Sequence, residues 1–401
     1  MEFIPLDLRT WNRREHFQHY LREAPCGYSL TRRLDVTERM ERDPGNYHLR
    51  QQMLRVYRAD IKTVDAFCTA LLRENCHLLG EDARGHALRP DFRVLDENEA
   101  QVLRERVLAR TLEDFYDHLT SGGTLLADTL GAGRDDSALE DLVLELHAKL
   151  QAQPYEDKWL EAQRAFWRAV PDKIEDTPYG KILLNEVRRK ARHCKSLLQR
   201  AAQEMCANDA LNQKYAPAFL DASYQLEALE GKIAQGWDAA RGVTIAFPRL
   251  AAVKDSDGGE MKARMKGLWD NCKETVKGFA EIFSASSDEA VEDLRTMAPA
   301  MLALIDLTAD FSRRYNEEKR RRNSADFSDQ EHEAIRLLVG KNGEPTELAA
   351  LVSTRYREIM VDEYQDTNEA QDRIFRAVSR REENLFMVGD VKQSIYGFRQ
   401  A

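Results

Sequence analysis

Two adjacent carboxylates follow a short apolar run near the end of the chain. The run at 359–361 leads directly into Asp362 and Glu363, so we expect a strand that presents both acids at its carboxyl end, where parallel sheets bind ligands. Asp362 can supply the carboxylate oxygen that a phosphate-chelated Mg²⁺ ion prefers, and Glu363 can polarise an attacking water. For an isolated Asp-Glu pair, a solvated acidic cap on the next helix would be the favoured interpretation.

A glutamine and two aromatic residues follow a second apolar run. Residues 384–390 lead into Gln393, Tyr396 and Phe398. Base–aromatic stacking contributes about 1–3 kcal/mol per base and tolerates any sequence, so these rings could contact single-stranded nucleic acid. Taken in isolation, they are better explained as ordinary core aromatics.

One sheet is expected to position both groups. Residues 357–362 and 384–390 are short, apolar and end in Asp, and a helical segment at 368–380 separates them. Strand, helix, strand is the pattern of a parallel sheet that is buried on both faces. We therefore expect Asp362 and Gln393 to flank one shared cavity.

The rest of the chain is mostly helical in pattern. From about 95 to 308 apolar residues recur at helical spacing among Leu, Ala, Glu, Lys and Arg. The segments 242–248 and 255–259 are predicted to be a loop that interrupts these helices. Residues 1–37 suggest a helix followed by a strand.

Composition predicts a globular, cytoplasmic protein. Of the 401 residues 43% are hydrophobic and 32% charged, and the net charge of −10 does not by itself indicate nucleic-acid binding. Six cysteines occur without a C-x-x-C pair, which argues against a zinc site or a disulfide framework. We expect no membrane span and no secretory signal.

The acidic string resembles a known helicase motif. D-E-Y-Q-D-T-N, from Asp362 to Asn368, resembles motif II of the UvrD/Rep/RecB superfamily 1 DNA helicases, in the form typical of AddA, the A component of AddAB-type helicase-nucleases. Residues 388–401 resemble motif III of the same family. The resemblance implies a catalytic set of Asp362, Glu363 and Gln393, with Asp362 as the Mg²⁺ ligand and Gln393 sensing the γ-phosphate.

The same resemblance implies roles in coupling and DNA binding. Tyr396 and Phe398 would present aromatic faces to bases, and Arg399 would pair with an acidic residue of motif II. The implied coupling residues are Gln365, Asp366, Asp390 and Arg399.

Two upstream segments extend the resemblance. Residues 59–73 resemble the family's T-x-x-S-F-C segment along the DNA track, which implies DNA contacts by Thr63 and Phe67. A helix N-cap Thr and a buried Phe are an equally good interpretation. Residues 324–329 resemble the D-F-x-D segment that returns the chain to the motor core. The basic run 319–322 before it could contact phosphate, although a solvated helix face is favoured.

Other expected parts are missing. The sequence contains no G-x-x-x-x-G-K-[ST] phosphate loop. Residues 1–37 instead resemble the N-terminus of chloramphenicol acetyltransferases, without that family's H-H-x-x-x-D-G motif. Motifs IV to VI and the nuclease domain are not found after motif III. We therefore expect a fusion of an acetyltransferase-like start with an internal helicase fragment.

The predicted fold is mainly α with a partial α/β core. An incomplete P-loop NTPase (RecA-like) parallel sheet would carry a large all-helical insertion. The predicted segments are an acetyltransferase-like N-terminal segment (1–37), a partial helicase motor core (38–94), a 1B-like helical arm (95–308) and a motor core with motifs II and III (309–401).

The resemblance implies a fragment of an ATP-dependent DNA helicase/exonuclease that acts in double-strand break repair and recombination. Its ligands would be Mg²⁺ and ATP, and its partners the single-stranded track of a DNA duplex and an AddB-type protein. Without a phosphate loop, this chain alone is expected to be inactive. Two alternatives remain: a non-catalytic helical module that binds DNA or a partner, and a chloramphenicol acetyltransferase relative, which the missing motif disfavours.

Overall fold

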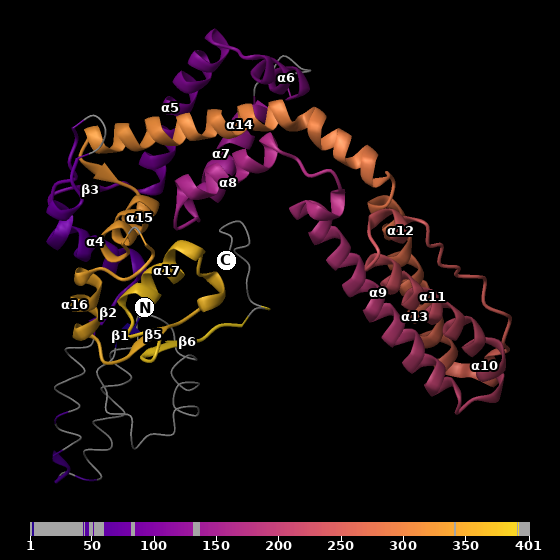
Figure 1. Ribbon diagram of the computed structural model, residues 1–401. Helices are drawn as coiled ribbons and strands as arrows, with labels where there is room; N and C mark the ends of the chain where they lie inside the picture. Colours follow the sequence, from indigo (N-terminus) through magenta and orange to yellow (C-terminus); the bar gives the residue numbers. More distant parts are fainter. Residues whose placement is uncertain are drawn as a thin grey trace. The chain divides into compact units, whose positions relative to one another are not determined.

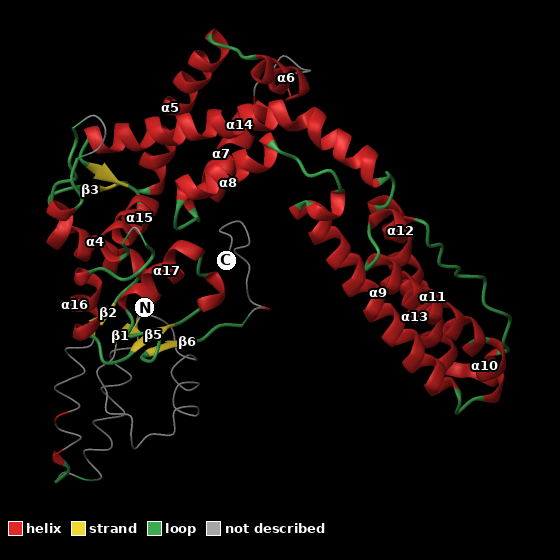
Figure 2. Ribbon diagram, in the orientation of Figure 1, coloured by secondary structure: helices red, strands yellow, loops and turns green. Residues whose placement is uncertain are grey.

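The computed structural model describes residues 2–3, 43, 45–47, 51, 60–81, 85–130, 137–340, 342–390 and 392. In this part the chain is mainly helical, with two small sheets (Figure 1, Figure 2). The chain divides into two compact units: Met1–Gln163 with Ala303–Ala401, and Arg164–Leu302. The helix and strand predicted within residues 1–37 lie outside the described residues, apart from residues 2–3.

The larger sheet belongs to the first unit and has the strand order β2-β1-β5-β6. β5 (Ile359–Val361) runs parallel to β6 (Leu385–Met387), with Ile359 opposite Leu385. Helix α17 (Glu369–Val378) lies between them in the chain. The predicted strand-helix-strand unit is therefore confirmed. The predicted burial on both faces holds for β5 but not for β6, where Phe386 is 42% exposed.

The sheet as a whole is mixed rather than parallel, which corrects the prediction. β1 (Glu2–Phe3) pairs antiparallel with both β2 (Asp60–Ile61) and β5. Two-residue strands are too short to show a period of two, and their pairing with distant segments leaves no mark on local sequence. The start of the chain, which was predicted to be a separate segment, thus contributes a strand to the sheet that contains β5 and β6.

A second, two-stranded sheet pairs the residues just before α5 with those just after α14. β3 (Arg93–Val94) runs parallel to β4 (Ser324–Ala325), and Arg93 N donates to Asn323 O at 3.0 Å. Positions more than 200 residues apart are thereby held side by side.

Helices cover the larger sheet of the first unit. α15 (Phe327–Leu338) packs against α4 (Val64–Asn75), α16 (Glu347–Arg355) and α17. Their apolar faces meet β5 in one core, whose fully buried members include Leu72, Leu338, Ile359 and Ile374. Further helices that the structure describes with residues in this unit are α5 (Glu97–Asp117), α6 (Ser121–Leu130), α7 (Ser137–Gln151), α8 (Glu156–Arg168) and α14 (Ser287–Arg321).

The second unit is a helical bundle with its own core. It contains α9 (Pro178–Met205), α10 (Asp209–Lys214), α11 (Ala216–Ile233), α12 (Trp237–Arg241) and α13 (Asp255–Ile282). α9 begins where Thr177 caps it and Pro178 occupies its first turn. Its buried residues recur every three or four positions, so one stripe faces α11 and α13.

The predicted loop in this bundle is partly confirmed. Residues 243–254 form neither helix nor strand, but the polar run 255–259 begins α13 instead of continuing the loop. Gly259, with φ 48° and ψ −139°, is the residue that departs from helical geometry. Among the described residues, no helix has the length and apolar character needed to cross a membrane.

Candidate active site

The chain leaves the sheet at two exposed carboxylates. β5 is buried along its length, whereas Asp362 and Glu363, which follow it, are exposed. Asp362 Oδ1 accepts a hydrogen bond from Glu363 N at 2.9 Å, and Glu363 has a left-handed backbone with φ 51° and ψ 40°. A left-handed residue other than glycine costs about 1–2 kcal/mol, and such strain concentrates at functional sites.

Gln365 connects the acidic pair to the segment after β6. Its Nε2 donates to Glu363 Oε2 at 2.5 Å, and its Oε1 accepts from Asp390 N at 2.9 Å. The Gln365 amide therefore donates to Glu363 in the motif II segment and accepts from Asp390 in the motif III segment. Three residues predicted for catalysis or coupling are thus brought into direct contact.

The backbones of the two segments also meet beyond the strands. Tyr364 N donates to Val388 O at 2.8 Å, and Val388 N donates to Val361 O at 2.9 Å. A Cβ placed on Gly389 would lie 2.7 Å from Gln365 Oε1 and 2.9 Å from Gln365 N. Only glycine permits this approach, so Gly389 is a site residue that the motif resemblance did not single out.

The Asp362 carboxyl is harder to ionise than an ordinary aspartate. Although the residue as a whole is exposed, partial burial of its carboxyl group raises its pKa. The backbone N–H of Glu363 lowers this pKa, and the negative charge of Glu363 raises it further. A bound cation would favour the ionised form. Among the described residues no group of three or more His, Cys, Asp or Glu could hold a metal, but Mg²⁺ bound through nucleotide phosphates needs only one or two carboxylates. The donor set therefore fits Mg²⁺.

Asp366, a predicted coupling residue, has an unused acceptor. Its Oδ1 is buried and accepts no hydrogen bond from the residues that the structure describes. A buried acceptor without a donor costs about 1–3 kcal/mol. Its predicted partner, Arg399, lies outside the described residues, so the pairing stays a prediction.

Side chains of α17 form a hydrogen-bond network with Tyr364 of the motif II segment, which was not predicted from the sequence. Tyr364 Oη donates to Asp372 Oδ1 at 2.7 Å, and Arg376 Nε donates to Asp372 Oδ2 at 2.6 Å. Burial and the Asp372 carboxylate raise the pKa of Tyr364. The i,i+4 spacing of Asp372 and Arg376 in the sequence could have predicted their ion pair on this helix.

Three predicted site residues of motif III have no described position. Gln393, Tyr396 and Phe398 lie outside the described residues. A shared cavity between Asp362 and Gln393, and base stacking by the two aromatics, therefore stay predictions.

The two residues predicted along the DNA track are placed on α4. Thr63 caps this helix, with its Oγ1 accepting from Ala66 N at 3.2 Å. Phe67 is 3% exposed and meets the edge of Tyr356 at a ring-centroid distance of 6.5 Å. A DNA contact by either stays a prediction.

The first half of the basic run before the D-F-x-D segment is not a solvated helix face, which corrects the favoured interpretation in part. Lys319 is buried and Arg320 half-buried, whereas Arg321 and Arg322 are exposed as expected. Lys319 is 1% exposed, and its Nζ lies 2.8 Å from Asp326 Oδ2, 2.7 Å from Asp329 Oδ1 and 4.0 Å from the Tyr315 ring centroid. Asp326 and Asp329 also form the capping box of α15. The D-F-x-D carboxylates therefore neutralise a buried lysine.

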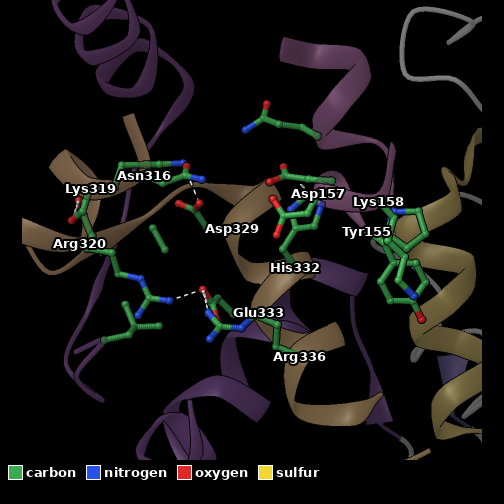
Figure 3. Close-up of a pocket in the computed structure, with 16 residues that line it drawn as sticks. Tyr155, Asp157, Lys158, Asn316, Lys319, Arg320, Asp329, His332, Glu333 and Arg336 are labelled. Atoms are coloured by element: carbon green, nitrogen blue, oxygen red, sulfur yellow. Dashed lines mark hydrogen bonds and ion pairs between the residues drawn. The ribbon is translucent and has the colours of Figure 1, made fainter. Parts of the chain in front are cut away.

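A cavity of about 430 Å³ lies beside this cluster, lined by residues of α8, α14 and α15 (Figure 3). Arg320 pairs with Glu333 on one wall, and His332 Nε2 lies 2.8 Å from Gln153 O. Burial and the charge of Asp326 raise the pKa of Asp329 to about 7. The cavity walls carry charges of both signs, so they do not by themselves select a ligand.

Comparison with known proteins agrees with the motif resemblance. The family described as the UvrD/REP helicase N-terminal domain matches residues 31–401. A Ruminiclostridium cellulolyticum protein, whose name makes it the A component of an ATP-dependent helicase/nuclease, is 32% identical over 384 residues, covering 91% of this chain and 30% of that protein.

Two further relatives carry the same name. The Desulfitobacterium hafniense (strain DSM 10664 / DCB-2) protein is 35% identical over 379 residues, covering 88% of this chain and 26% of its own length. The Desulforudis audaxviator protein is 35% identical over 377 residues, covering 90% of this chain and 30% of its own length. The chain thus spans less than a third of the curated relatives described here.

Proposed function

Since the chain belongs to the UvrD/REP helicase family, we propose that its β5–β6 edge is the Mg²⁺- and water-binding part of an ATP-dependent DNA motor. The observation that carries this proposal is the Gln365 amide, which joins Glu363 to Asp390 by hydrogen bonds of 2.5 and 2.9 Å. Through these hydrogen bonds Glu363 is connected to Asp390, which precedes the proposed DNA-stacking residues Tyr396 and Phe398 in the chain.

Each residue at this edge has a distinct proposed task. Asp362 would hold Mg²⁺, which neutralises charge on the nucleotide phosphates when it is bound. Glu363 would accept a proton from the attacking water, and the hydrogen bond from Gln365 Nε2 orients its carboxylate. Gln365 would transmit a displacement of Glu363 to Asp390 through the hydrogen bonds described above.

The wider role follows from the relatives. Proteins named as the A component of an ATP-dependent helicase/nuclease are about a third identical to this chain. We extend their activity to it and propose work on DNA in double-strand break repair and recombination, in the cytoplasm, together with an AddB-type protein. The incomplete RecA-like core and the helical arm are part of the same proposal.

The 401-residue polypeptide by itself would hydrolyse ATP negligibly, because its sequence has no phosphate loop to cradle the triphosphate. The check is a coupled ATPase assay with and without single-stranded DNA. DNA-stimulated turnover at the rate of an intact motor, lost in the Glu363→Gln variant, would contradict this expectation.

Metal binding tests the site independently of turnover. Titration with Mn²⁺, followed by electron paramagnetic resonance, should reveal a weak site that Asp362→Asn removes. Asp270→Asn, which changes an exposed aspartate of α13, should leave it intact. Unchanged Mn²⁺ affinity in the Asp362→Asn variant would contradict the proposed role and favour the alternative of a non-catalytic DNA-binding module.

A further inference from the structure

An arginine-rich groove lies between α5 and α14 and shares no residue with the candidate active site. Its volume is about 280 Å³, and all its walls belong to the first compact unit. We call it the arginine groove; it is lined by His86, Arg106, Val107, Arg110, Arg313, Arg314, Glu317, Glu318 and Arg321.

Two of the arginines have no acidic partner among the described residues. Arg106 and Arg110 are exposed, and neither forms an ion pair with any residue that the structure describes. They are four residues apart on α5, which places their side chains on one face about 6 Å apart along the helix. Two guanidinium groups therefore line the groove with their hydrogen-bond donors available.

The arginines of α14 are fixed in place by neighbouring carboxylates. Arg321 Nη2 lies 2.8 Å from Glu318 Oε1 on the same helix. Arg314 forms an ion pair with Asp114, which ties α14 to α5. These pairs hold the walls of the groove together and orient the cationic groups before any ligand arrives.

The groove is positive although the protein is acidic. Five arginines and two glutamates line it, and two acids outside the lining, Asp114 and Asp310, pair with the α14 arginines. The unpaired positive charge therefore belongs to Arg106 and Arg110, in a chain whose net charge is −10. Like charges brought together repel one another, and an anion in their midst relieves that repulsion. The guanidinium fork matches phosphate oxygens in a bidentate manner.

We propose that the arginine groove binds successive phosphates of a nucleic-acid backbone. The arginines are spread over two helices, and Arg313 to Arg321 alone span about 12 Å along α14. A single small anion would contact only part of such a row, whereas a strand offers a line of phosphates. The inference rests on the proposed function, because it takes DNA as the partner.

The test uses the full chain and fluorescence anisotropy with a labelled 20-base-pair duplex, over a series of salt concentrations. The test variant is Arg106→Gln/Arg110→Gln. The matched control is Arg200→Gln/Arg249→Gln, which removes the same charge from two exposed arginines of the other unit that form no ion pair with described residues. Circular dichroism melting should show all three proteins equally folded.

The expected result is a roughly tenfold loss of duplex affinity at low salt in the test variant, with a slope of log K against log salt shallower by about 1.8, or about 0.9 for each lost phosphate contact. The control should keep the affinity and slope of the wild type. Wild-type affinity and slope in the test variant would overturn the proposal.

A second titration separates nucleic acid from free polyanions. If tripolyphosphate binding depends on Arg106 and Arg110 while duplex binding does not, the groove is an anion site of another kind and the proposal is overturned. If the wild-type chain binds no DNA, the inference falls together with the proposed DNA partner. If the wild type binds the duplex and the Arg106→Gln/Arg110→Gln variant binds it equally well, the inference about the groove fails while the proposed DNA partner stands.

Discussion

Lys319 lies between the Asp326 and Asp329 carboxylates with 1% of its side chain exposed. Replacing it by Met would leave two buried acids without a counterion. We expect Lys319→Met to lower the free energy of unfolding by about 3–5 kcal/mol, the usual cost of breaking a buried ion pair. Urea unfolding monitored by circular dichroism measures it.

The control for this prediction is Lys149→Met. Lys149 pairs with Glu145 on the surface, and both side chains are about half exposed, so its loss should cost under about 1 kcal/mol. Similar losses in the two variants would mean that the Lys319 cluster is no more stabilising than a surface pair.

Asp329 should make stability depend on pH. Its pKa in the folded protein is raised to about 7, above the ordinary value of 3.8, so the folded state binds more protons between these values. Stability is then greatest below about pH 4 for this group and falls as pH rises toward 7. Each unit of raised pKa corresponds to at most about 1.4 kcal/mol.

The Asp329→Asn variant tests this dependence, because Asn imitates the protonated acid. Urea unfolding of both proteins at intervals from pH 4 to 8 should give a shallower decline for the variant. Parallel curves for the two proteins would show that Asp329 is not the titrating group.

At the scale of elements, the junction of the two motifs depends on Gly389. In Gly389→Ala the new Cβ would lie 2.9 Å from Gln365 N, and the backbone would have to move. We expect a loss of about 1–3 kcal/mol and weaker Mn²⁺ binding, because Gln365 holds Glu363 and the backbone N–H of Glu363 in turn orients the Asp362 carboxylate. Thermal unfolding and Mn²⁺ titration provide the measurements.

Gly267→Ala is the matched control. A Cβ on Gly267, inside α13, meets nothing within 4 Å, so this change should stabilise the helix by about 0.5–1 kcal/mol. Gly389→Ala as stable as the wild type would indicate that the close approach is not required.

How much the sequence predicts differs between these elements. Helix α9 could be predicted because its apolar stripe repeats within one segment, and the β5–β6 pair because each run is continuous and bounded. The antiparallel pairing of β1 and the burial of Lys319 could not be predicted, since both depend on residues that meet only after folding. A charge run therefore does not by itself indicate exposure. Asp326 and Asp329 follow Lys319 by only 7 and 10 positions, but they reach its ammonium group only once α14 and α15 pack together.

The candidate site shows the same division. The acidic pair was predictable because Asp362 and Glu363 directly follow an apolar run. The Gln365 connection to Asp390 was not, because it spans 25 positions and depends on the register between β5 and β6. Gly389 was within the quoted motif, but its close approach emerges only from the folded backbone.

At the scale of the whole molecule, each compact unit has its own core, and α14 contributes residues to both units. We expect the two cores to unfold separately, as is common for chains with more than one domain. Leu198→Ala removes a fully buried side chain from the second unit, and Leu338→Ala does so in the first. Each should destabilise its own unit by about 2–5 kcal/mol.

Hydrogen exchange read peptide by peptide distinguishes separate from joint unfolding. Leu198→Ala should speed exchange in α9 and α11 and leave α15 and α17 at wild-type rates, while Leu338→Ala should do the reverse. If either variant accelerates exchange equally in both units, the chain unfolds as one cooperative body. In that case α8 and α14 connect the two cores, because each of these helices contributes residues to both units.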